Sequence, residues 1–103
     1  MVMYKKLVRD KIPDIIRGSG KEPITRILNE EEYLKELIKK LREEVAEFEE
    51  DYSIEELADI KEVTIAIREA LGIHAGKLED IRRAKATKNG RFKNRIYLED
   101  VAK

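Results

Sequence analysis

Apolar side chains recur every three or four positions between residues 34 and 48, which is the spacing of an amphipathic helix. Just before them, Asn29 and Glu32 match a capping box, in which each side chain bonds the backbone N–H of the other residue. The pattern therefore predicts a helix over residues 30 to about 50. Its apolar stripe consists of Leu34, Leu37, Ile38, Leu41, Val45 and Phe48.

A second helix is expected directly after the first. Ser53 and Glu56 repeat the capping-box spacing, the apolar pattern continues through Leu71, and Gly72 stands where a helix commonly ends. Only Asp51 and Tyr52 separate the two helices. Because helices joined by so short a link pack antiparallel, we expect a helix hairpin at the centre of the fold.

The second helix of this hairpin is apolar on two sides. At roughly 100° per residue, its first face carries Leu57, Ile60, Val63, Ile67 and Leu71, with Glu56 on the same face and Asp59 at its edge. A second stripe, nearly opposite, consists of Ile54, Ala58 and Ile65. A small protein cannot cover both sides, so the second side is expected to contact another subunit in a homodimer or homotetramer.

Shorter elements are expected on both sides of the hairpin. Asp10 can cap a brief helix that ends at Gly18 or Gly20. A further helix over residues 75–87 is expected to turn Leu78, Ile81 and Ala84 inward, and residues 95–98 alternate as a short strand does, with residues 3–8 as its partner. The fold class is therefore all-α, a single domain over residues 1–103 with a bundle of about four helices and room for a short terminal β pairing.

Composition excludes several kinds of protein. The chain has no cysteine, so a disulfide framework, a thiolate metal site and a cysteine nucleophile are all excluded. No apolar run approaches the length of a membrane span, and the first residues are too charged for a secretory signal. We therefore expect a cytoplasmic protein without a membrane partner.

The charges balance over the whole chain but are sorted along it. Residues 30–62 contain 14 acidic and 5 basic side chains, whereas residues 82–95 contain 7 basic side chains and no acidic one. An acidic segment can concentrate divalent cations, and a basic segment can bind phosphate. The sorting suggests a nucleotide enzyme but does not establish one.

Four carboxylates occupy matched positions on the two helices of the hairpin. Glu44 and Glu47 are three residues apart on the first helix, and Glu56 and Asp59 repeat that spacing on the second. Both pairs lie near the connecting link, so they can converge. Four like charges in one volume need a cation, and Mg²⁺ accepts an all-oxygen site, with Mn²⁺ as a substitute. One of the metal-bound waters, or one held by a spare carboxylate such as Glu43, can then serve as the nucleophile.

A simpler interpretation of the same carboxylates stays open. Glu-rich helices are commonly solvated, Glu56 stands where a capping box places a glutamate, and Glu44 and Glu47 fall on the flank of the apolar stripe. Asp59 has no capping role and borders an otherwise apolar face. That position favours the metal-site hypothesis.

At these residues the sequence resembles the all-α nucleoside triphosphate pyrophosphohydrolases, the MazG-like superfamily. The group is marked by Glu-Glu-x-x-Glu on one helix and Glu-x-x-Asp on the next, which here read Glu43-Glu44-Val45-Ala46-Glu47 and Glu56-Leu57-Ala58-Asp59. The resemblance implies that Glu44, Glu47, Glu56 and Asp59 bind magnesium, and that Glu43 participates. It also implies that the α–β phosphoanhydride bond is cleaved, giving the monophosphate and pyrophosphate.

Two flanking stretches extend the resemblance over nearly the whole chain. Residues 4–13 look like the opening of a small branch expected to remove non-standard or surplus nucleotides. Residues 89–95 are similar to a phosphate-binding Asn-x-Lys-Phe-x-x-Arg segment, with Arg91 in place of the lysine. The link between the carboxylate pairs is shorter than is typical of MazG.

Basic residues near both ends are the candidate phosphate ligands. Lys88, Arg91 and Arg95 can neutralise the leaving pyrophosphate, and an arginine fork suits phosphate oxygens. Arg9 and Lys11 precede the first short helix and are further candidate substrate contacts. The single histidine, His74, follows Gly72 and is expected in a loop or capping position.

The sequence thus predicts a magnesium-dependent nucleoside triphosphate pyrophosphohydrolase. One alternative is phosphoribosyl-ATP pyrophosphohydrolase, which shares the helical carboxylate motif, although residues 4–13 argue against it. The other is a non-catalytic helical oligomer that binds nucleic acid or a partner protein through residues 82–95. We expect a nucleoside triphosphate, and not nucleic acid, as the binding partner.

Overall fold

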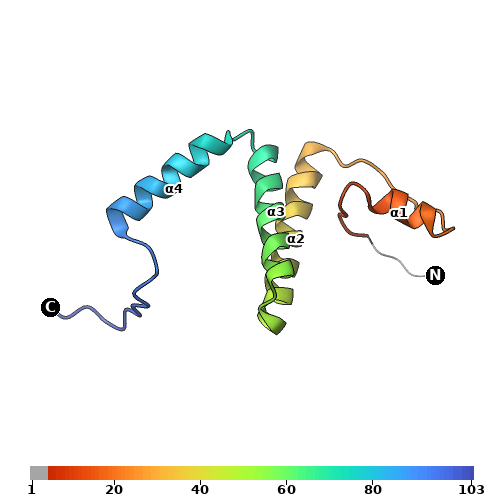
Figure 1. Cartoon of the computed structure of the whole chain (residues 1–103). Coiled ribbons are helices and arrows are strands. Elements are labelled where there is room, and N and C mark those ends of the chain that lie inside the picture. Colours follow the sequence, from red (N-terminus) through yellow and green to blue (C-terminus); the bar gives the residue numbers. More distant parts are fainter. Residues whose placement is uncertain (1–4) are drawn as a thin grey trace. The chain divides into compact units, whose positions relative to one another are not determined.

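The computed structural model describes residues 5–103, and these contain four helices and no strand. The helices are α1 (Ile12–Gly18), α2 (Glu30–Asp51), α3 (Ile54–Ala70) and α4 (Ala75–Asn89), labelled in Figure 1. The chain divides into two compact units, Met1–Gly72 and Ile73–Lys103. The all-α class is confirmed, and the expectation of a single domain stays a prediction.

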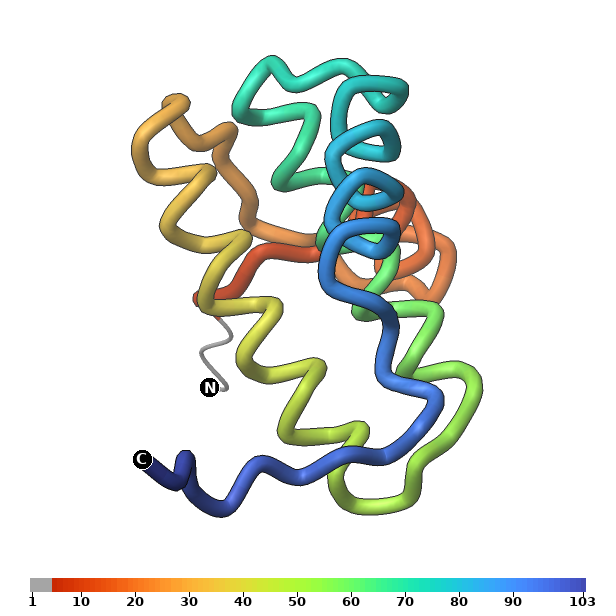
Figure 2. Tube along the Cα trace, turned by 90° about the vertical axis from the view of Figure 1, so that its left-hand side faces the viewer, coloured from red at the N-terminus to blue at the C-terminus, as the bar shows by residue number. Residues whose placement is uncertain are grey.

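The central hairpin is confirmed, and α2 and α3 run back along one another from their link (Figures 1 and 2). Asn29 caps α2 with a complete capping box, in which Asn29 Oδ1 accepts from the Glu32 N–H at 2.9 Å. Tyr52, in the left-handed region at φ 54°, reverses the chain after α2. Ser53 then caps α3, and Gly72 at φ 70° follows its last turn. These local signals set both helices where the sequence places them.

The core of the hairpin is small. Leu37 on α2 and Val63 on α3 are the only buried apolar residues within residues 5–103, at 3% and 8% exposure. Glu44, seven residues after Leu37 and therefore two turns along the same face, is buried with them at 6%. Ile38 and Val45, expected in the apolar stripe, are 39% and 40% exposed. The interface between the helices is thus narrower than the expected stripe.

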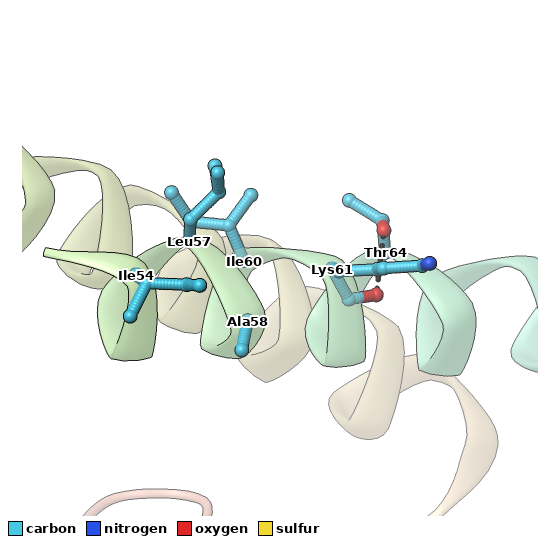
Figure 3. Close-up of a pocket in the computed structure, with 6 residues that line it drawn as sticks. All are labelled: Ile54, Leu57, Ala58, Ile60, Lys61 and Thr64. Carbon is cyan, nitrogen blue, oxygen red and sulfur yellow. Dashed lines mark hydrogen bonds between the residues drawn. The ribbon is translucent and has the colours of Figure 1, made fainter.

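The outer face of α3 carries an apolar depression of about 440 Å³ (Figure 3). Leu57 was expected on the inward face, but it is 52% exposed and lines this depression together with Ile54 and Ala58. The prediction for Leu57 is therefore wrong, because the inward face of α3 centres on Val63 and Glu56 instead. Of the second stripe, Ile54 and Ala58 are exposed and Ile65 is half-buried, and its contact with another subunit stays a prediction.

The short helix α1 differs slightly from its expected form. It begins at Ile12 with Lys11 as the N-cap residue, and no side chain bonds the free amides there, so Asp10 is not the cap. Pro13 in the first turn fixes the helical φ angle and needs no hydrogen-bond partner for its nitrogen. The Ile12 N–H donates to the Arg9 carbonyl at 3.0 Å, which ties the turn before α1 to the helix.

The second unit consists of α4 and the residues after it. The His74 ring caps α4 by accepting from the Gly76 N–H at 3.1 Å, which confirms a capping role. No residue of α4 is buried, and Leu78 and Ile81 are both 47% exposed, so the expectation that they turn inward is wrong within this structure. The predicted strand at residues 95–98 is also wrong, since this segment has no regular structure; of its expected partner, residues 3 and 4 lie outside the described residues.

None of the helices within residues 5–103 combines the length and the hydropathy that crossing a bilayer requires.

Candidate metal centre

Three carboxylates meet between α2 and α3. Glu44, Glu56 and Asp59 each contribute one oxygen to a group whose members all lie within 4.8 Å of one another. Glu44 comes from α2, and Glu56 and Asp59 come from successive turns of α3. The helix hairpin therefore brings together three of the four predicted metal ligands.

Glu44 is the most unusual member of the cluster, because its carboxylate lies in the core and has lost almost all of its hydration. Its side chain is 7% exposed, and Lys40 Nζ lies 3.4 Å from its Oε1. Its other oxygen, Oε2, is buried with no hydrogen-bond partner. A buried polar atom without a partner costs free energy. The prediction that Glu44 lies on the flank of the apolar stripe is therefore wrong.

The Glu56 side chain does not serve as the capping-box glutamate that its position at the start of α3 suggests. Ser53 Oγ accepts from the Glu56 N–H at 3.2 Å, but the Ser53 N–H donates to Asp51 at 3.1 Å, so the Glu56 carboxylate is not needed for the cap. Glu56 Oε2 is instead buried without a partner. Hydrogen-bond contact with Glu44, partial burial and the nearby Glu47 raise the pKa of Glu56 to about 7.

Asp59 completes the cluster from the next turn of α3 and has a basic partner. Arg9 Nη2 donates to Asp59 Oδ1 at 2.6 Å, which joins residues 50 positions apart in the sequence. The Arg9 side chain is 59% exposed and that of Asp59 is 35% exposed. The segment before α1 is thereby joined to α3.

The two remaining acidic candidates lie beside the cluster. Glu47 is exposed, yet it acts on Glu56 and helps to raise its pKa, so it is close to the site. Glu43 is half-buried on α2, next to Glu44 in the sequence. Among these carboxylates, Glu44 is paired with Lys40 and Asp59 with Arg9, whereas Glu44 Oε2 and Glu56 Oε2 have no hydrogen-bond partner. The cluster therefore retains an excess of negative charge.

The donor set fits a hard divalent cation. All of the candidate ligand atoms are carboxylate oxygens, which magnesium and manganese accept and which soft metals do not prefer. The buried Oε2 atoms of Glu44 and Glu56 are unpaired oxygens at which a cation removes both the desolvation penalty and the mutual repulsion. Glu44, Glu56 and Asp59 would hold the ion, and Glu47, which acts on Glu56, is the further candidate ligand.

The raised pKa of Glu56 gives a test of the cluster without any metal. Between pH 4.5 and about 7, folded Glu56 keeps a proton that the unfolded chain has lost. The unfolded state therefore binds fewer protons, and stability falls as the pH rises through this window. In EDTA, we expect the wild type to lose more unfolding free energy between pH 5 and pH 8 than Glu56→Gln does, as measured by urea denaturation. Identical pH profiles for the two proteins would contradict the arrangement.

The predicted phosphate ligands belong to the second unit. Arg91 and Arg95 line a hollow of about 370 Å³, and Lys88 stands in the last turn of α4. Gly90 and Arg95, at φ 86° and 56°, shape the loop, and the Arg95 N–H donates to the Phe92 carbonyl at 3.2 Å. Their role towards phosphate stays a prediction, as does that of Lys11, which is exposed at the N-cap of α1.

Part of the basic segment is already paired within α4. Glu79 lies 2.6 Å from Arg82 Nη2 and 3.1 Å from Arg83 Nε. Bonding to Arg82 in particular lowers the pKa of Glu79 to about 2. Two of the charges on which a nucleic-acid-binding surface would depend therefore have an internal counter-charge.

Neither the role of Lys40 nor the pairing of Arg9 with Asp59 was predicted from the sequence. The contact between Lys40 and Glu44 could have been predicted from their spacing, because residues four apart lie on the same face of a helix. The contact between Arg9 and Asp59 could not have been predicted in this way, since no local pattern relates two residues 50 positions apart.

Comparison with known proteins gives one partial relative. A Mycolicibacterium smegmatis protein described as uncharacterized is 55% identical over 42 residues, which is 41% of this chain and 43% of that protein. The match therefore covers less than half of that relative's length. No family model matches the chain. No solved structure matches it either.

Proposed function

We propose that this protein is a magnesium-dependent nucleoside triphosphate pyrophosphohydrolase of the MazG-like type. The observation that carries the proposal is the pair of buried carboxylate oxygens without partners, Glu44 Oε2 and Glu56 Oε2, beside Asp59. A cluster that served only the fold would gain stability from apolar residues at these positions. Carboxylates at these positions are explained if they bind a cation.

The acidic residues of the proposed site have two roles. Glu44, Glu47, Glu56 and Asp59 hold the cation, and Glu43 accepts the proton of the water that attacks the α-phosphate. Magnesium, when bound, supplies positive charge to the triphosphate oxygens and makes water more acidic. The bond from the α-phosphorus to the bridging oxygen breaks, and pyrophosphate leaves.

The basic residues of the second unit complete the proposal. Lys88, Arg91 and Arg95 bind the phosphates of the substrate and stabilise the charge that develops on pyrophosphate. Arginine suits this role because its fork can donate two parallel hydrogen bonds to phosphate oxygens. The physiological task in this proposal is the removal of non-standard or surplus nucleotides in the cytoplasm.

A panel of substrates tests the proposal directly. Pyrophosphate release is measured from canonical, deoxy and modified nucleoside triphosphates and from phosphoribosyl-ATP, each with magnesium, with manganese and with EDTA. We expect turnover only with a divalent cation, and monophosphate as the second product. Turnover of phosphoribosyl-ATP alone would favour the histidine-synthesis alternative. Salt-sensitive binding of nucleic acid without any turnover would favour the non-catalytic alternative.

The proposed enzyme acts as a homodimer or homotetramer, and the outer face of α3 supports this part of the proposal. Ile54 is 76% exposed and Leu57 is 52% exposed, and both lie beside Ala58 on this face. The face therefore exposes apolar surface to water. A second copy of the chain presents the same stripe, which suits a two-fold contact. Sedimentation at micromolar concentration is expected to give a dimer or larger, and Leu57→Asp is expected to shift it towards monomer. A wild-type monomer would contradict this expectation.

A further inference from the structure

An ion pair joins the segment before α1 to the carboxylate cluster, and it occupies one of the proposed metal ligands. Arg9 Nη2 lies 2.6 Å from Asp59 Oδ1. A divalent cation at Asp59 places a second positive charge on the same carboxylate and weakens the attraction that holds the guanidinium there. Arg9 and the cation therefore compete for Asp59.

Breaking the ion pair between Arg9 and Asp59 costs little free energy, because both side chains are partly exposed. The Arg9 side chain is 59% exposed, and exposed ion pairs contribute little to stability because water solvates both partners. Lys40, at 25% exposure beside the buried Glu44, is the more enclosed of the two basic partners. Of these two, Arg9 is the one that a cation displaces more readily.

The backbone of Arg9 remains in place when its side chain is released. Its carbonyl accepts from the Ile12 N–H at 3.0 Å, so the turn before α1 holds the residue independently of Asp59. The other guanidinium donors have no recorded partner within residues 5–103, and the side chain as a whole is 59% exposed. A released guanidinium thus stays beside the cluster with its donors free for an anion.

Resting on the proposed function, we infer that Arg9 neutralises Asp59 in the metal-free protein, is displaced when a divalent cation binds, and then binds a phosphate group of the nucleotide. Arg9 is thereby a cation competitor before loading and a phosphate ligand after it. The exchange accounts for an arginine at this position, because its fork can hold either a carboxylate or a phosphate.

The inference predicts two changes of opposite sign in one variant. In Arg9→Gln, the affinity for Mn²⁺, measured by electron paramagnetic resonance, is expected to increase about two- to fivefold, since a weak competing pair is lost. The affinity of the Mn²⁺-loaded protein for inorganic pyrophosphate, measured by calorimetry, is expected to fall about tenfold, since a charge-assisted contact is lost. Arg9→Lys is expected to lie between the wild type and Arg9→Gln in both measurements.

Arg17→Gln is the matched control, because Arg17 pairs with Asp14 at 2.9 Å on α1 and does not contact the cluster. It is expected to change neither affinity, and circular dichroism checks that all variants are folded. If the wild type binds Mn²⁺ and releases pyrophosphate but Arg9→Gln binds Mn²⁺ equally or less tightly, Arg9 only orients Asp59 and the inference fails while the proposed function stands. Unchanged pyrophosphate affinity would also overturn it. A wild type that binds no Mn²⁺ overturns both.

Discussion

Replacing Glu56 by glutamine is expected to reduce magnesium-dependent pyrophosphate release at least about 100-fold, because a metal ligand loses its charge. The side chain keeps its size, and one of its oxygens has no partner to lose. Asp59→Asn is expected to have an effect of the same order. Initial rates over a range of magnesium concentrations measure the loss and show whether added metal restores any activity.

A second measurement distinguishes a ligand from a residue that only supports the fold. In the metal-free protein, Glu56 is held beside Glu44 and Glu47, which disfavour its charge. Glu56→Gln removes that repulsion, so its unfolding free energy in EDTA at pH 8 is expected to equal or exceed that of the wild type. Activity is therefore expected to fall without any loss of stability.

The matched control for this variant is Glu55→Gln, one position earlier on α3. Glu55 is exposed and is not among the three clustered carboxylates. Its replacement is expected to change turnover less than about twofold, as for an ordinary surface substitution. Wild-type turnover in Glu56→Gln, or equal losses in the two variants, would remove Glu56 from the site.

Leu37→Ala is expected to destabilise the protein by about 3 kcal/mol, which is the usual cost of truncating a fully buried leucine. Leu37 is 3% exposed, and within residues 5–103 only Val63 and Glu44 are buried with it. So small a core cannot compensate for a cavity by rearranging elsewhere. Urea denaturation monitored by circular dichroism measures the change.

The control for Leu37 is its neighbour Ile38, which is 39% exposed on the adjacent face of α2. Ile38→Ala is expected to cost about 1 kcal/mol, less than Leu37→Ala, because 39% of its surface stays in water in the folded state. Equal losses for the two variants would mean that Ile38 is covered in solution, as it would be in an interface between subunits.

The proposed metal site and the fold make opposing demands on α2. Leu37 and Glu44 share one helix face, so the contact that stabilises the hairpin also buries a carboxylate. Lys40 compensates one oxygen of Glu44 and leaves the other without a partner. The site thus depends on the hairpin for its shape and weakens it when no cation is bound.

Local sequence determined where the helices begin and end. Asn29 and Ser53 cap α2 and α3, Gly72 follows α3, and His74 caps α4, as their residue types and spacing predict. Each of these features depends on bonds between residues only two or three positions apart. A sequence pattern can therefore predict them, together with the pairing of carboxylates on successive turns.

Only the tertiary structure decided which side of each helix is covered. Glu44 lies in the core and Leu57 lies outside it, the reverse of what hydrophobicity suggests, because helix packing selects a face by shape and position. The contact between Arg9 and Asp59 likewise exists only because the chain folds back on α3. Such contacts join residues distant in sequence, and no local pattern encodes them.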